Sequence, residues 1–274
     1  MNKISWAAAL IVVFAITGWT RAAESAPPAT QSDVKVTTRP SQTLMLDLGN
    51  NVRMKLILIP VGKFIMGSPI DEKDRMREEG PQREVTLARA FYMGIHHVTQ
   101  EQYEAVMGQN PSCFKGPQHP VEQVSWDHAA EFCRKLSGRT GKVVRLPTEA
   151  EWEYACRAGS NTRFSFGDDD SRLGDYAWYV GNSDKTTHPV GQKKPNAFGL
   201  HDMHGNVGAW CSDYYANSYA NAEKIDPRGP ASGTNHVLRG GCWGHDARFC
   251  RSAFRIGSSG SGSLYGFRVV VDMN

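Results

Sequence analysis

The chain has 274 residues, of which 40% are hydrophobic and 22% are charged, and its formal net charge is +3. This apolar content excludes a disordered chain, because such a chain lacks the hydrophobic surface that offsets the entropy of folding. The small net charge gives no indication of a nucleic-acid partner. A chain of this length buries a full core without a disulfide or a metal.

Residues 1–23 have the pattern of a secretory signal peptide. Lys3 provides a positive charge, and residues 6–16 form an uninterrupted apolar run. This run suits the core of a signal peptide and is short for a transmembrane helix, which needs about 20 residues. We therefore expect cleavage after one of the small residues between positions 22 and 25, and a periplasmic or secreted location. An uncleaved membrane anchor is the alternative.

Residues 24–43 are rich in proline, serine, threonine and alanine, which is typical of a flexible linker. The remaining residues, 44–274, predict one folded domain. No second long apolar run follows the first. We therefore expect no membrane association beyond the signal peptide.

Six strands are predicted from short apolar runs that lie between turn residues. The first two are expected to be joined by a turn. The predicted strands are at 54–60, 62–67, 84–87, 91–93, 237–239 and 266–271.

Three helices are predicted by the residues that cap them. Thr99 and Gln102 have the spacing of a capping box, and so do Thr148 and Glu151. Ser125 precedes a third segment, in which the apolar residues have helical spacing. The expected helices span 100–108, 126–138 and 149–159, each ending near a glycine.

Strands and helices do not alternate along the chain as they do in βαβ folds. Beyond residue 160, glycine, proline, asparagine and aromatic residues dominate, and residues 257–263 form a Gly/Ser connector. The pattern predicts an α+β domain that is rich in irregular loops.

The cysteines are the residues most able to support chemistry. Of the six, Cys242 and Cys250 flank His245. Two sulfurs and one imidazole suit Cu(I) or Zn²⁺, so this segment predicts a soft-metal site or, alternatively, a disulfide across the turn. Cys133 and Cys156 lie on apolar helix faces and are expected to be small buried residues.

Four arginines lie in or beside the same segment. They either recognise an acidic partner, or they pack their stems and donate hydrogen bonds to loop carbonyls. They are Arg239, Arg248, Arg251 and Arg255.

Eight ordered segments carry a resemblance to a known family. They are GKFIMGS, EVTLARAFYMG, VTQEQYEAVMGQNPS, HPVEQVSWDHAAEFC, RLPTEAEWEYACRAG, HPVGQKKPNAFGLHDMHGNV, VLRGGCWGHDARFCRSAFR and YGFRVV. Together they resemble the formylglycine-generating enzyme (sulfatase-modifying factor) family. The resemblance implies a single compact α+β domain related to C-type lectins. It also implies an activity in which O₂, and Cu(I) held by two thiolates, oxidise a sulfatase cysteine to formylglycine.

The resemblance also implies that the copper site is altered. The family's serine and two active cysteines correspond to Cys242, His245 and Cys250, and a tryptophan of its active site corresponds to Gly208. Soft thiolates select Cu(I), so His245 and Cys250 cannot form the two-thiolate site. A copper site made of Cys250 with either His245 or Cys242 is the alternative.

A calcium site of the family is implied in weakened form. Its ligands correspond to Asp202 and to the carbonyl oxygens of Gly205 and Val207, while a further glutamate is replaced by Ala209. Ca²⁺ takes about six to eight oxygen ligands, so the lost carboxylate lowers its affinity.

Three hypotheses for function follow. We favour an exported, monomeric family member that lacks the two-cysteine copper oxidase activity. It would bind a peptide or partner protein in the old substrate cleft, with a sulfatase or another cysteine-containing peptide as the partner class. The second hypothesis is an active oxidase of sulfatase cysteine with the modified metal site. In the third, Cys242 and Cys250 form a structural disulfide.

Overall fold

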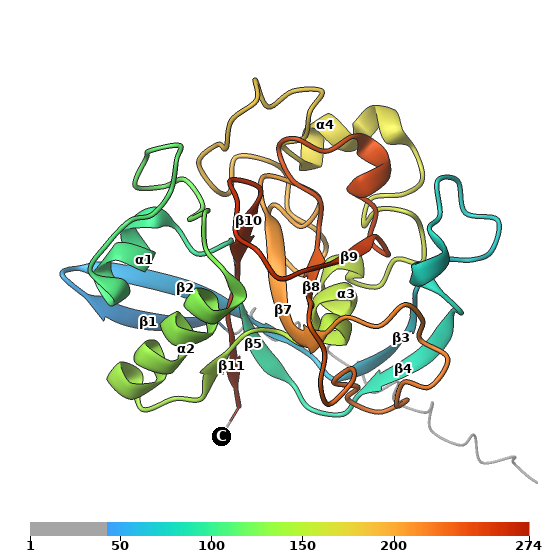
Figure 1. Ribbon diagram of the computed structural model, residues 1–274, viewed down its shortest axis with the longest axis horizontal. Helices are drawn as coiled ribbons and strands as arrows, with labels where there is room; N and C mark the ends of the chain where they lie inside the picture. Colours follow the sequence, from blue (N-terminus) through green and yellow to red (C-terminus); the bar gives the residue numbers. More distant parts are fainter. Residues whose placement is uncertain (1–42, 274) are drawn as a thin grey trace, which may run out of the picture. The chain divides into compact units, whose positions relative to one another are not determined.

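The computed structural model describes residues 43–273, so the predicted signal peptide and nearly all of the predicted linker lie outside the described residues. The described part contains strands, α-helices and short 3-10 turns joined by irregular segments (Figure 1). The strands are β1 (Thr43–Gly49), β2 (Val52–Ile59), β3 (Gly62–Met66), β4 (Arg83–Leu87), β5 (Phe91–Gly94), β6 (Val144–Arg145), β7 (Gly208–Tyr214), β8 (His236–Arg239), β9 (Arg255–Ser258), β10 (Tyr265–Phe267) and β11 (Val270–Asp272). The α-helices are α1 (Gln100–Met107), α2 (Trp126–Thr140), α3 (Glu149–Arg157) and α4 (Leu173–Tyr176), and the 3-10 turns are Arg77–Glu79, Asp170–Arg172 and Ala247–Phe249.

Three sheets organise the domain. Five strands form an antiparallel sheet in the order β1-β2-β5-β11-β6. Four strands form a second sheet in the order β10-β7-β8-β9, in which β10 and β7 are parallel, and β3 pairs with β4. Helices α1 and α2 lie beside β1 and β2, whereas α3 lies near β3, β7 and β8 (Figure 1). The second sheet therefore stands between these two regions.

The three longer helices begin after the predicted capping residues, and α1 and α3 have both hydrogen bonds of the capping box. The predicted end of α2 is wrong, because the helix continues past Gly138 to Thr140. Its left-handed C-cap is Gly141, with φ 66°. A glycine inside a helix costs about 1 kcal/mol relative to alanine, which this longer helix tolerates.

The predicted strands are confirmed in place, and the short connection between the first two is also present. Strands β2 and β3 form no hairpin, because β2 pairs with β1 and β5, while β3 pairs with β4. The predicted strand at 266–271 is two strands, β10 and β11. Strands β1, β6, β7 and β9 were not predicted. All but two of the seven residues of β7 are buried, so the strand lacks the alternation that marks a half-buried strand.

Two hydrophobic clusters form most of the core. In the first, Tyr103 of α1 and Phe132 of α2 meet Phe267 of β10, with ring centroids 6.2 and 5.2 Å from that of Phe267. In the second, Trp152 of α3 packs among residues that include Met203 and Ala209. Burying one such side chain contributes roughly 1.5–3 kcal/mol. The second cluster supports the segment that carries the candidate site.

No helix within residues 43–273 is long and apolar enough to span a membrane.

Candidate functional site

The segment that follows β8 turns sharply at two glycines. Gly240 and Gly241 have φ values of 95° and 64°, in the left-handed region that favours glycine. A Cβ on Gly240 would lie 2.8 Å from the ring of Trp152, and one on Gly241 would lie 2.9 Å from Sγ of Cys250. The turn therefore seats the following segment on α3 and on Cys250.

Cys242 and His245 line one small cleft. The backbone N–H of His245 donates a hydrogen bond of 3.0 Å to the carbonyl oxygen of Cys242. Gly208 and Leu264 line the same cleft, whose volume is about 10 Å³. A space of this size holds about one water molecule.

Cys250 is fully buried beneath the glycine turn, where it packs with Phe164 and Leu173. Burial raises the pKa of Cys250 well above its ordinary value. Burial also raises the pKa of Cys242 to about 12, although hydrogen bonds from nearby backbone amides oppose this. Both sulfurs are therefore protonated thiols at neutral pH.

The imidazole of His245 lies among aromatic rings. Its centroid is 5.3 Å from the ring of Phe249 and 6.1 Å from that of Phe254. Burial lowers the pKa of His245, and the carboxylate of Asp246 only partly opposes this effect. Its Nδ1 is buried and has no hydrogen-bond partner among the described residues. At neutral pH the side chain is an uncharged ring.

The three candidate copper ligands do not fit the two-thiolate copper site. The family's site has two cysteine sulfurs, whereas the corresponding positions here are His245 and Cys250, so a single sulfur remains at these two positions. Among residues 43–273, no group of three or more His, Cys, Asp or Glu side chains has an arrangement that could hold a metal ion. All six cysteines are free thiols, so the structure does not contain the disulfide of the third hypothesis. As predicted, Cys133 and Cys156 are small buried residues.

Asp202 occupies the centre of the implied calcium site. It is buried with φ 58°, and its Oδ2 accepts a hydrogen bond of 2.8 Å from the backbone N–H of Gly191. Its Oδ1 is buried and has no partner among the described residues. Burial raises the pKa of Asp202, against the opposing effect of the nearby guanidinium of Arg268. A buried carboxylate oxygen without a donor suits a cation ligand.

The rest of the implied calcium site is incomplete. Gly205 and Val207 are buried in the segment that follows Asp202, so their carbonyls belong to the same region. Ala209 is buried in β7 and supplies no side-chain oxygen. Of these positions, only Asp202 offers a side-chain oxygen, which is fewer anionic ligands than Ca²⁺ prefers.

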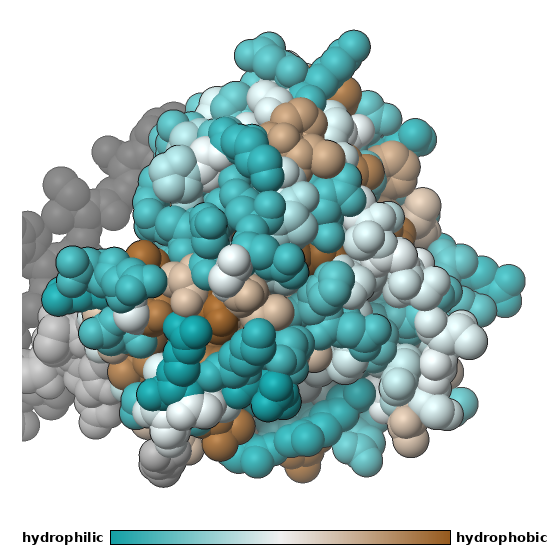
Figure 2. Space-filling model, turned by 60° about the vertical axis from the view of Figure 1, so that its left-hand side comes forward, coloured by the Kyte–Doolittle hydropathy of each residue, from teal (hydrophilic) through white to brown (hydrophobic). Residues whose placement is uncertain are grey.

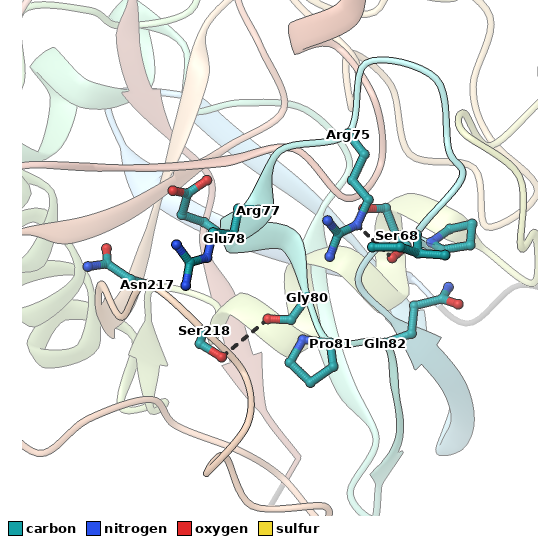
Figure 3. A pocket seen from close by; sticks show the side chains of 11 residues that line it. Ser68, Arg75, Arg77, Glu78, Gly80, Pro81, Gln82, Asn217 and Ser218 are labelled. Carbon is teal, nitrogen blue, oxygen red and sulfur yellow. Dashed lines mark hydrogen bonds between the residues drawn. The ribbon is translucent and has the colours of Figure 1, made fainter.

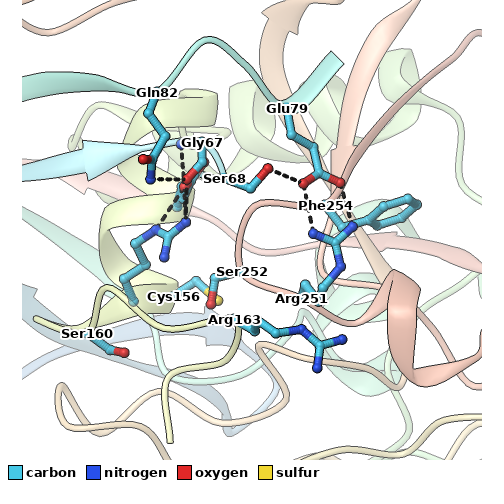
Figure 4. A network of polar contacts seen from close by, with 12 residues as sticks. Gly67, Ser68, Glu79, Gln82, Cys156, Ser160, Arg163, Arg251, Ser252 and Phe254 are labelled. Atoms are coloured by element: carbon cyan, nitrogen blue, oxygen red, sulfur yellow. Dashed lines mark hydrogen bonds and ion pairs between the residues drawn. The ribbon is translucent and has the colours of Figure 1, made fainter. Parts of the chain in front are cut away.

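Three of the four arginines near the turn are buried and paired with glutamates. Arg251 donates from both of its terminal nitrogens to Glu79, at 2.6 and 2.8 Å, and Figure 4 shows this fork with Ser68 on the other side of Glu79. Arg248 is the exposed member. The buried pairs are Arg239–Glu153, Arg251–Glu79 and Arg255–Glu149. This arrangement supports a structural role for these three arginines rather than recognition of an acidic partner.

The surface offers larger openings away from the small cleft. Figure 3 shows a pocket of about 750 Å³, in which Arg75 donates to the carbonyl oxygen of Ser68 and Ser218 donates to that of Gly80. The face drawn in Figure 2 is mostly hydrophilic, with hydrophobic residues in small groups. Small groups of this kind are ordinary for a soluble domain and mark no docking site by themselves.

A cavity of about 560 Å³ lies beside β7 and was not predicted from the sequence. Asp213, near the end of β7, and Glu149, at the start of α3, both line it. The available signal was a lone carboxylate in the apolar run of residues 207–215. That signal is weak, because such residues also serve as helix caps.

The fold and the glycine turn define a class of protein: an α+β domain of the formylglycine-generating type. The family model for the sulfatase-modifying factor enzyme 1-like domain matches residues 47–273. The chain therefore belongs to this family.

Individual relatives agree with this assignment. The chain is 30% identical over 242 residues to the chaperone protein LppX of Paenibacillus barcinonensis, covering 69% of this chain and 82% of that protein. It is 30% identical over 287 residues to the formylglycine-generating enzyme of Mus musculus, covering 80% and 75%. Among solved structures, Treponema denticola variable protein 1 matches with a TM-score of 0.77 and 32% identity, covering 84% of this chain and 99% of that one. These matches confirm the predicted family and the predicted α+β fold.

Proposed function

We propose that this protein is an exported member of the family that lacks copper-dependent cysteine oxidase activity and acts by binding a partner protein or peptide. The observation that carries the proposal is the state of the cleft. His245 stands where the resemblance places one of the two copper-binding cysteines, and Cys250 is fully buried beneath the glycine turn. Oxidation by the family's chemistry needs two thiolates and space for a substrate cysteine.

The size of the cleft also changes where binding is expected. The space directly between Cys242 and His245 is narrow, with a volume of about 10 Å³, so a bound peptide would rest mainly on the surface around it. The pockets elsewhere on the domain are large enough for a ligand group. The match over most of its length to a relative named a chaperone protein supports a binding role.

A turnover assay tests the loss of activity. The purified protein is incubated with Cu(I), O₂ and a peptide of the pattern Cys-x-Pro-x-Arg, and aldehyde is measured by mass spectrometry. A formylglycine-generating enzyme assayed in parallel confirms that the conditions support the reaction. We expect no aldehyde above the level of a Cys250→Ala variant. More than one aldehyde per protein molecule in the wild type, absent from the variant, would overturn the proposal.

Binding without chemistry has its own assay. Immobilised Cys-x-Pro-x-Arg and Ser-x-Pro-x-Arg peptides are compared by surface plasmon resonance. We expect the cysteine and serine peptides to bind with affinities that agree within a factor of about 3, which is less than 1 kcal/mol, because the proposed binding does not use the thiol. A strong preference for the cysteine peptide that is lost in Cys250→Ala would instead support a working thiol site.

Export is tested on the full-length chain. We expect the protein in the extracytoplasmic fraction to have lost its first 22 to 25 residues, the span of the candidate cleavage sites. An intact N-terminus in that fraction would favour the uncleaved anchor.

A further inference from the structure

We propose that the cavity beside β7 binds a ligand that bears an ammonium group on an apolar body, and that Asp213 is the residue that recognises the ammonium. The cavity is separate from the cleft of Cys242 and His245, and nothing in the proposed loss of oxidase activity depends on it.

Three carboxylates gather where α3 begins, and they differ in their partners. Glu151 is paired with Arg145 at 2.7 Å, and Glu149 is paired with Arg255 at 2.5 Å. Asp213 has no cation within salt-bridge distance among the described residues. It is therefore the member of the group whose negative charge is not matched by an arginine.

The two oxygens of Asp213 have different surroundings. Oδ2 accepts hydrogen bonds from the backbone N–H of Glu149 at 2.9 Å and from the hydroxyl of Ser212 at 3.0 Å. Oδ1 has no hydrogen-bond partner among the described residues. A Cβ at Gly229 would lie 3.2 Å from Oδ1, so the glycine backbone approaches this oxygen closely without a side chain in contact with it. Oδ1 is therefore the atom available to a ligand that donates hydrogen bonds.

The side chain of Asp213 is almost completely buried, with 4% of its surface exposed, although it lines the cavity. Burial and the nearby carboxylate of Glu149 raise its pKa to about 7. A carboxylate in such a place is stabilised by an added cation, because the cation supplies the charge that the protein does not.

The walls of the cavity suit an apolar ligand body. They are mainly apolar or aromatic, and the aromatic faces also attract cations. The positive charge of Arg255 is neutralised by Glu149. Arg228 and Glu223 lie exposed in solvent at the lining, where their charges are opposite and screened. Arg83 also lines the cavity; it has no salt bridge among the described residues, and its Nη1 donates a hydrogen bond of 2.8 Å to the carbonyl oxygen of Tyr219. The apolar and aromatic lining residues include Met66, Ala150, Tyr214, Ala216, Tyr219 and Pro227.

Matched small probes test the charge requirement. Phenethylamine, 2-phenylethanol and 3-phenylpropionate share one ring and differ in the charge of the head group. Binding to the purified chain is followed by saturation-transfer NMR and calorimetry at a pH of about 8, where Asp213 is ionised. We expect phenethylamine to bind and the neutral and anionic probes to bind at least about tenfold more weakly. Equal binding of all three, or no binding of phenethylamine at millimolar concentration, would overturn the proposal.

Two variants locate the site. Asp213→Asn keeps an oxygen for the Glu149 amide and loses the charge, so the affinity for phenethylamine should fall at least about tenfold. Ala222→Phe adds a ring at a residue that lines the cavity and should also reduce binding. Asp47→Asn, at an exposed position on β1, is the matched control and should bind like the wild type. Thermal unfolding checks that each variant is folded, and unchanged affinity in a folded Asp213→Asn would contradict the proposal.

A second arm separates two sources of the ammonium. N-acetyl-lysine methylamide presents the amine as a protein partner's lysine would, and phenethylamine presents it as a free small amine. Tighter binding of the lysine derivative would assign the cavity to a protein partner. Tighter binding of phenethylamine would assign it to a small-molecule ligand.

Discussion

The imidazole of His204 and the backbone carbonyl oxygen of Cys250 lie 2.8 Å apart and join two separate segments of the candidate site. The other ring nitrogen, Nε2, accepts hydrogen bonds from the backbone N–H of Ser165 at 3.1 Å and from its hydroxyl at 2.8 Å. Nδ1 therefore carries the proton, and the ring is neutral. Burial lowers the pKa of His204 to about 4, although the bond to the Cys250 carbonyl opposes the shift.

A pH-dependent loss of stability follows for His204. Because its folded-state pKa lies below the ordinary value of 6.5, its contribution is present above pH 6.5 and is lost as the pH falls toward about 4. The wild type should therefore lose up to about 3 kcal/mol more than His204→Gln over this range. Urea unfolding at a series of pH values measures the difference. His128→Gln, at an exposed position on α2, should follow the wild type. Parallel curves for wild type and His204→Gln would contradict the assignment.

The sequence predicted the helices well because their signals are local. The caps at Thr99, Ser125 and Thr148 depend on residues within one turn of the helix, and all three are present. Strand pairing is not local. The apolar runs that form β2 and β3 are neighbours in sequence, yet they pair with different strands. The burial gained in two separate sheets outweighs the small entropic advantage of pairing two strands that are joined by a short loop.

Adding one methyl group to the glycine turn at the site should lower stability strongly. Gly241 has φ 64°, and a Cβ there would lie 2.8 Å from the carbonyl oxygen of Phe249. Gly241→Ala should therefore lower the free energy of unfolding by about 2 kcal/mol or more, through both strain and overpacking. Chemical denaturation measures the loss. Gly260 has open space around its Cα, so Gly260→Ala is the matched control and should change stability by less than about 0.5 kcal/mol. A similar effect of both substitutions would refute the packing argument.

Arg251 and Arg248 differ in burial, so replacing them should lower the free energy of unfolding by different amounts. Arg251 is fully buried against Glu79, whereas 56% of the side chain of Arg248 is exposed. Arg251→Met leaves a buried carboxylate without its cation and should cost about 3–5 kcal/mol. Arg248→Met should cost less than about 1 kcal/mol. Adding Glu79→Gln to Arg251→Met should recover part of the loss, and a double-mutant cycle that showed no coupling would contradict the pairing.

The chemistry of the site could be predicted only in part from the sequence. The ligand positions Cys242, His245 and Cys250 were identified through the resemblance, and the turn does bring Cys242 and His245 to one cleft. The raised pKa of Cys250 could not be predicted from the sequence, because it depends on burial beneath Gly241 and beside aromatic rings that are distant in the chain. The role of Arg251 likewise depends on a partner that lies 172 positions away in the chain.

Adding Ca²⁺ tests whether the buried, unpartnered Oδ1 of Asp202 binds a cation. We propose that the site holds Ca²⁺ weakly, because Oδ1 of Asp202 is buried without a partner and Ala209 supplies no carboxylate. Millimolar Ca²⁺ should raise the Tm of the wild type and leave that of Asp202→Asn nearly unchanged. A Tm of the wild type that does not respond to Ca²⁺, measured after treatment with EDTA, would exclude the site.

Asp213 should give the opposite pH dependence from His204. Burial and the carboxylate of Glu149 raise its folded-state pKa from 3.8 to about 7, with a smaller effect of Glu151 in the same direction. The contribution of Asp213 is therefore full below about pH 4 and is lost as the pH rises through about 7. Relative to Asp213→Asn, the wild type should lose up to about 4 kcal/mol over that interval. Urea unfolding of both proteins, with Asp47→Asn as the exposed control, measures this difference. A difference that grows with pH would show that Asp213 has a cation partner in the folded protein and would remove the reason to expect an ammonium ligand.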